Sequence, residues 1–212
     1  MIMVKQFPGW LLHRKVSSSL QGRLTLSSGK ELSMKQHKQL IKLVLAGLFL
    51  ALAYVMPFLT GQIPQLGSML CPLHIPVLIC GFICGWPWGL AVGFISPLLR
   101  SFTLGMPPLF PNAVCIAFEL ATYGAVAGLM HRILPKKKPF IYCSLLTAMV
   151  SGRLVWGAAM MICMGIKGSV FTINAFLAGA FFNAIPGIII QIVLIPIIVM
   201  LLDNPKILDL RE

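Results

Sequence analysis

Acidic residues are almost missing from the long central part of this chain. Of the five Asp and Glu residues among its 212, Glu119 alone lies between residues 32 and 202. A soluble domain is about a quarter charged because its surface faces water. This chain is 10% charged and 58% hydrophobic, and its mean hydropathy is +0.92. Lipid is therefore the solvent that suits its outer surface, and the sequence predicts an all-α membrane protein.

Apolar runs separated by short polar turns predict six transmembrane helices. The second run is too short to cross a bilayer as a straight helix without help from its neighbours. Residues 1–38 are polar and predict a mobile cytoplasmic N-terminal extension. Residues 39–203 form the predicted membrane domain, and residues 204–212 a cytoplasmic tail. The six predicted segments are 39–57, 74–85, 90–104, 112–133, 140–165 and 174–202.

The positions of Lys and Arg predict how these segments are oriented, since such residues concentrate in cytoplasmic loops. With the N-terminus inside, all but three of the 17 Lys and Arg residues fall in inside stretches. The exceptions are Arg100, Arg153 and Lys167. We therefore expect both termini inside (N-in/C-in). The connections after the first, third and fifth segments then face outside. They are long and rich in Pro and Gly, as binding loops commonly are.

Two charged residues within the apolar segments are candidates for function, because a charge inside the hydrocarbon is costly. At 1.5 Å rise per residue, Glu119 lies about 12 Å and Arg153 about 15 Å from the outer ends of their helices. The matching depths allow an ion pair. One interpretation is a structural salt bridge between two helices. The other is that Arg153 meets a ligand carboxylate while Glu119 orients it. Both can hold, since a guanidinium offers five donors.

Further polar and aromatic residues are candidates for the same outward-facing site. Arg100 lies at the outer end of the third segment, where it lines the site or merely reaches the interface. Asn183, in the outer half of the sixth segment, is a better ligand candidate than Gln191, for which helix–helix hydrogen bonding is favoured. Trp156 could stack on a flat ligand, although ordinary packing also explains it. Weaker candidates are Asn112, Tyr123 and His74.

The sequence shows no enzyme constellation, and the expected class is not an enzyme. The chain has no HExxH, GxSxG, DxD or P-loop pattern, and one membrane acid is too few for a paired-carboxylate mechanism. Six cysteines lie mostly in apolar runs and are read as small packing residues. We expect no metal site and no cofactor. The basic residues do not form a stripe on a polar surface, so no nucleic-acid partner is expected.

Three local stretches, in this order, resemble the substrate-binding S components of energy-coupling factor (ECF) vitamin transporters. They are LAGLFLALAYVMPF, PLHIPVLICGFICGWPWGLAVGFISPLLRS and GMPPLFPNAVCIAFELATYGAVAGLM. The resemblance covers about residues 38–203 and includes the six short segments and the long outer loops. The last two stretches resemble the broad group of S components that includes pantothenate and folate carriers. It implies an ECF S-component-like helical bundle.

The resemblance also implies partners. An S component binds one small molecule near its outer face and docks onto a membrane coupling protein that carries two ATPase subunits. Docking in the family uses small residues in the first helix, typically Ala-x-x-x-Ala. Here the nearest match is Gly47-x-x-x-Ala51, a spacing that leaves a smooth groove for a partner helix. Packing within the chain is the alternative.

The expected function is therefore the substrate-binding subunit of an ATP-driven ECF importer in the cell membrane, a multi-pass protein. Arg153, Asn183 and Arg100 favour a carboxylate-bearing vitamin or vitamin precursor, with pantothenate as the best guess. The alternative is a stand-alone proton-coupled carrier that uses Glu119 as its proton site.

Overall fold

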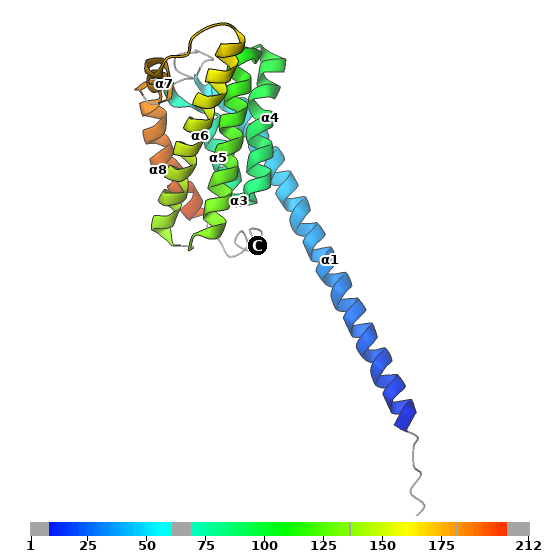
Figure 1. Cartoon of the computed structure of the whole chain (residues 1–212). Coiled ribbons are helices and arrows are strands. Elements are labelled where there is room, and N and C mark those ends of the chain that lie inside the picture. The colour runs from blue at the N-terminus through cyan, green and yellow to red at the C-terminus, as the bar shows by residue number, and fades with distance from the viewer. Residues whose placement is uncertain (1–8, 61–68, 136, 181, 203–212) are drawn as a thin grey trace, which may run out of the picture. The chain divides into compact units, whose positions relative to one another are not determined.

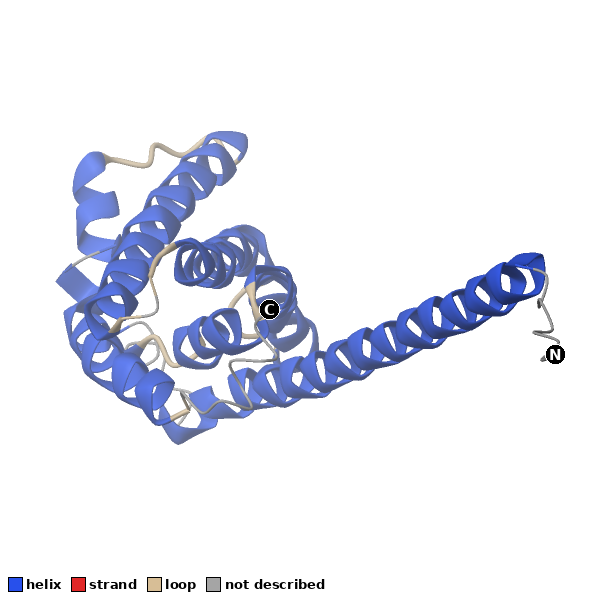
Figure 2. Cartoon of the chain, turned by 90° about the horizontal axis from the view of Figure 1, so that it is seen from below, coloured by secondary structure: helices blue, strands red, loops and turns tan. Residues whose placement is uncertain are grey.

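The computed structural model of the chain describes residues 9–60, 69–135, 137–180 and 182–202. Within these ranges the regular elements are helices joined by short connections (Figure 2). The chain divides into two compact units, residues 1–41 and 42–212. The predicted tail, 204–212, lies outside the described residues. The all-helical fold class is confirmed.

The first helix begins well before the first predicted membrane segment, 39–57. Helix α1 runs from Gly9 to Val55, 47 residues, so the predicted N-terminal extension is helical from residue 9 onward. Between Pro8 and Pro57 the sequence has no proline to interrupt an α-helix. The 3-10 helix η1, Met56–Thr60, follows directly.

Helix α3 (His74–Cys84) lies in the interior of the second unit and is followed by α4 (Trp86–Leu104). All 11 residues of α3 are buried. Gly85 joins the two helices with φ 95°, a left-handed region that a residue with a Cβ rarely adopts.

Helix α5 (Val114–Ile133) packs between α4 and α6 (Lys138–Ile166), as Figure 1 shows. A short π-helix, η2 (Leu109–Ala113), leads into α5. The α4–α5 contact is a backbone contact: a Cβ on Gly89 would lie 2.6 Å from the Gly124 carbonyl oxygen, and a Cβ on Gly124 would overlap the Gly89 backbone. These two glycines therefore let the helices approach more closely than larger residues would.

The sixth predicted segment is not one helix, so that prediction is corrected. It consists of α7 (Ile173–Ala180), a 3-10 turn η3 (Phe182–Ala184) and α8 (Ile185–Leu201). Pro186 is the second residue of α8, in the first turn of the helix, where a proline is tolerated because its missing N–H would have no partner within the helix. Pro196, by contrast, lies inside α8 without ending it.

Four described stretches are long and apolar enough to cross a membrane, and α3 is a shorter apolar helix. Their outward-facing side chains are largely apolar; Leu154, Ile162 and Val193 are examples of exposed ones. Such a surface is expected for helices in lipid. The four stretches are Leu32–Phe58, Leu109–Ile133, Lys138–Ile166 and Ile173–Leu201.

Candidate functional site

The predicted pair of charges is present and buried. Arg153 Nη1 on α6 lies 2.9 Å from Glu119 Oε1 on α5, and the two side chains are 8% and 2% exposed. A buried pair of this kind is stable only if its geometry is good and its remaining polar atoms are satisfied. The candidate site is therefore centred on this ion pair.

A glycine lets the two helices meet at this level. A Cβ on Gly152, next to Arg153 in α6, would lie 3.0 Å from the Tyr123 ring and 3.2 Å from the Glu119 carbonyl oxygen. Both of these atoms belong to α5, so α6 approaches α5 closely beside the ion pair. The short separation explains how two side chains of moderate length reach a 2.9 Å contact.

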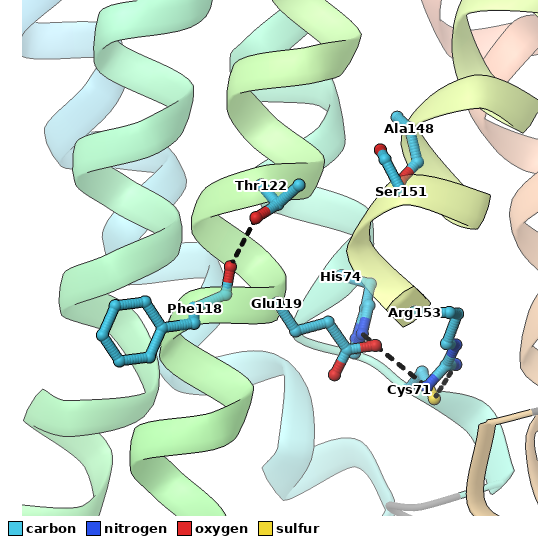
Figure 3. Close-up of polar contacts among 8 residues, drawn as sticks. All are labelled: Cys71, His74, Phe118, Glu119, Thr122, Ala148, Ser151 and Arg153. Carbon is cyan, nitrogen blue, oxygen red and sulfur yellow. Dashed lines mark hydrogen bonds and ion pairs between the residues drawn. The ribbon is translucent and has the colours of Figure 1, made fainter. Parts of the chain in front are cut away.

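A third helix contributes His74, the first residue of α3. Its Nε2 faces Glu119 Oε1 at 3.5 Å, which is long for a hydrogen bond. Its ring packs edge-on against Tyr123, with centroids 5.0 Å apart. Figure 3 shows the Glu119 carboxylate lying between His74 and Arg153. Sequence analysis ranked His74 and Tyr123 as weaker candidates, yet both belong to this cluster.

Cys71, in the segment that precedes α3, completes the cluster and was not expected there. Arg153 Nη2 donates to Cys71 Sγ at 3.7 Å (Figure 3). Cys71 has φ 47°, unusual for a non-glycine residue, and its carbonyl accepts the His74 N–H at 3.1 Å. Strained backbone of this kind is often found at functional sites. The signal available in the sequence was a cysteine directly before a proline, at the entry to the short α3.

Two buried polar atoms of the cluster have no hydrogen-bond partner within the described part of the chain. They are Arg153 Nε and His74 Nδ1. Leaving such an atom unpaired costs about 1–3 kcal/mol. The cluster therefore retains donors and acceptors that a polar ligand could use, while its formal charges, one positive and one negative, balance.

Arg100 lies apart from this cluster. It is 5% exposed, its Nη1 donates to the Tyr54 carbonyl at 3.2 Å, and its guanidinium lies 5.6 Å from the Phe58 ring centroid. The carbonyls in the last turn of a helix have no partner within the helix. Arg100 thus ties α4 to the C-terminal end of α1.

Trp156 is one turn from Arg153 on α6 and sits in an aromatic group. Its ring stacks on Phe176 of α7 with centroids 6.2 Å apart, and contacts Phe171 edge-on at 6.0 Å. Asn112, in η2, and Asn183, in η3, are both exposed. The structure therefore joins Glu119, Arg153 and Trp156 on one pair of helices, and places the two asparagines on separate surface turns.

The two small residues predicted for docking lie on the outside of α1. Gly47 and Ala51 are exposed, and a Cβ on Gly47 would meet nothing within 4 Å. Ala46 and Ala53 are buried, with Ala46 in the main apolar core. The Gly47–Ala51 face is thus not used for packing within the described part of the chain.

Comparison with known families adds one finding. Residues 41–199 match the family model described as "ECF transporter, substrate-specific component". The match covers all of the helices from the end of α1 to α8, including each residue of the buried cluster. Neither a curated protein nor a solved structure matches the chain.

Proposed function

Because this chain belongs to the family of substrate-specific components of ECF transporters, we propose that it captures a carboxylate-bearing vitamin or vitamin precursor, such as pantothenate, for import. The family is a transporter family and not an enzyme family. The observation that carries the proposal is the state of Arg153. One of its nitrogens pairs with Glu119, while its buried Nε has no acceptor among the described residues.

A single guanidinium can serve both roles because it has five N–H donors. Glu119 holds Arg153 in place, and the remaining donors face a ligand carboxylate. Trp156, one turn along α6, packs against the apolar part of the ligand. We also propose that Asn183 and Asn112, which are exposed on separate surface turns, contact the ligand. For Arg100, the contacts with Tyr54 and Phe58 support a role in holding the helices that frame the site.

We propose that the chain crosses the cell membrane six times with both termini inside. The support is the clustering of Lys and Arg in the stretches that this topology puts inside. Four described stretches have the length and composition of membrane spans. The remaining crossings are α3 and α4, which pack against α5. That packing supplies the help from neighbours that the 11-residue α3 needs.

The proposed partners are a membrane coupling protein and two ATPase subunits. The chain's sequence has no P-loop, so ATP-driven uptake requires another subunit. The Gly47–Ala51 face of α1 is exposed and unobstructed, which is what close docking of a partner helix needs.

The test separates ligand binding from folding. Arg153→Gln alone leaves Glu119 buried without its cation, so it would lose stability as well as binding. The double variant Glu119→Gln/Arg153→Gln keeps two neutral hydrogen-bonding side chains. We expect it to melt near the wild type but to bind the vitamin about 10- to 100-fold more weakly, since a hydrogen bond to a charged group contributes about 1.5–3 kcal/mol.

Binding is measured by calorimetry on purified protein with a panel of carboxylate-bearing vitamins. The matched control is Lys167→Gln, which removes a cation that lies over Phe110, 5.5 Å from the ring centroid, away from Arg153. A folded double variant with wild-type affinity would remove Arg153 from the site. Uptake that persists in cells lacking the ATPase subunits would contradict the ECF mechanism.

A further inference from the structure

A small group of sulfur-containing side chains lies apart from the main core. Cys115, Met160 and Cys163 pack together as a separate buried cluster. Cys115 is the second residue of α5, and Cys163 lies in the last turn of α6. The two helices run in opposite directions, so these residues share one end of the α5–α6 pair.

The two cysteines of this cluster come from different helices. Cys115 of α5 and Cys163 of α6 pack in the same buried group, and both are free. Cys115 is fully buried and Cys163 is 7% exposed. Cys80 and Cys84 are also free and lie one turn apart, but both belong to α3, so they provide a comparison within a single helix.

Two other contacts fix the register of α5 against α6 around the thiols. On one side, Glu119 pairs with Arg153 at 2.9 Å. On the other, Lys167 Nζ lies 5.5 Å from the centroid of the Phe110 ring in η2. In the sequence, Cys115 lies between Phe110 and Glu119, and Cys163 lies between Arg153 and Lys167. Their juxtaposition is therefore a consequence of helix packing that several independent contacts support.

We propose that Cys115 and Cys163 are a redox modification site, at which a small-molecule disulfide converts the two thiols into a bond that links α5 to α6. The Cys163 thiolate attacks one sulfur of the reagent, forming a mixed disulfide and releasing one thiol. The Cys115 thiolate then attacks Cys163 Sγ and releases the second. Two protein thiols are oxidised, and one small disulfide is reduced to two thiols.

The order of attack follows from exposure. Cys163 is the more exposed of the pair and lies in a last helical turn, where local opening costs least. Cys115 needs to reach only its neighbour. The new bond would fix the separation of two helix ends, at which Cys115 lies one turn before Glu119 and Cys163 about three turns after Arg153. It depends on the packing of α5 against α6 and not on which ligand the protein carries.

The experiment uses the full-length protein with Cys143→Ser, which removes the one free cysteine that is exposed among the described residues, in lipid nanodiscs with 2,2′-dithiodipyridine, a neutral disulfide that enters lipid. After treatment we expect the intact mass to fall by two hydrogen atoms, with release of two thiopyridone molecules per chain. Alkylation after denaturation should then modify three of the five remaining cysteines, and the peptides that contain Cys115 and Cys163 should be recovered cross-linked. The oxidised protein should also melt at a higher temperature than the reduced one.

Matched variants in the same Cys143→Ser background identify the pair. Cys115→Ser should stop at a mixed disulfide on Cys163, whereas Cys80→Ser/Cys84→Ser should react as the parent protein does. Five alkylated thiols in the treated parent protein, under conditions that fully modify the unfolded chain, would overturn the proposal. So would a parent protein that keeps a stable mixed disulfide on Cys163, or a cross-link that joins other cysteines.

Discussion

Glu119 shows what a single charge does inside an apolar bundle. Its carboxylate pairs with Arg153 and faces His74, so residues from three helices converge on one group. The pair was predictable, because Glu119 is the one acid between residues 32 and 202 and Arg153 has a matching depth. The part played by Cys71 was not, since it depends on a left-handed backbone angle that no periodic pattern encodes.

At this residue we predict that Glu119→Gln destabilises the protein by about 3–5 kcal/mol, because Arg153 stays buried without its counter-charge. The measurement is thermal unfolding in detergent, followed by the exposure of buried cysteines. Adding Arg153→Gln should restore most of the lost stability. A Glu119→Gln protein that melts like the wild type would show that the ion pair contributes no stability.

At the scale of elements, helix contacts in this protein depend on small residues. Gly89 and Gly124 bring the α4 and α5 backbones together, and Gly152 brings α6 close to α5. Sequence patterns located the bounds of α3 to α6 to within a few residues, because apolar runs end at Gly and Pro. They did not locate the break between α7 and α8. Pro186 predicts a kink, but the same residue type at position 196 leaves α8 intact, so neighbouring contacts decide the outcome.

The glycine contact gives a prediction with an internal control. Gly124→Ala should destabilise the protein by about 1–3 kcal/mol, as overpacking typically does, because its Cβ meets the Gly89 backbone. Gly47→Ala should leave stability unchanged or raise it, since the added Cβ meets nothing within 4 Å and alanine is the better helix former. The measurement is the midpoint of thermal unfolding. Equal effects of the two substitutions would contradict a specific α4–α5 contact.

At the scale of the whole molecule, one subunit must present two working surfaces. In the proposed function the buried cluster binds the cargo and the exposed Gly47–Ala51 face of α1 docks another protein. In the main core, Ala46 and Phe49 face the bundle, so the opposite face of the same helix is available for a partner. The sequence indicated both surfaces and named Gly47 and Ala51 for docking. The structure adds that these two residues are exposed, whereas Ala46 and Ala53 of the same helix are buried.

We predict that Gly47→Leu separates the two activities. The isolated variant should bind its vitamin as the wild type does, while uptake in cells that contain the ECF module should fall at least tenfold. The control is Leu52→Phe, which adds bulk at an exposed position about 140° further around the helix. Normal uptake by Gly47→Leu would remove this face from docking.

The position of Trp156 also makes it an intrinsic fluorescence reporter of ligand binding. Its indole is half-buried and in contact with Phe171 and Phe176, which belong to the connection after α6 and to α7. An indole in such a setting changes its emission when the surrounding rings move or water enters. Replacing Trp10, Trp86 and Trp88, the other three tryptophans, by phenylalanine would leave this one fluorophore one helical turn from Arg153. Cargo capture could then be followed in real time without a label.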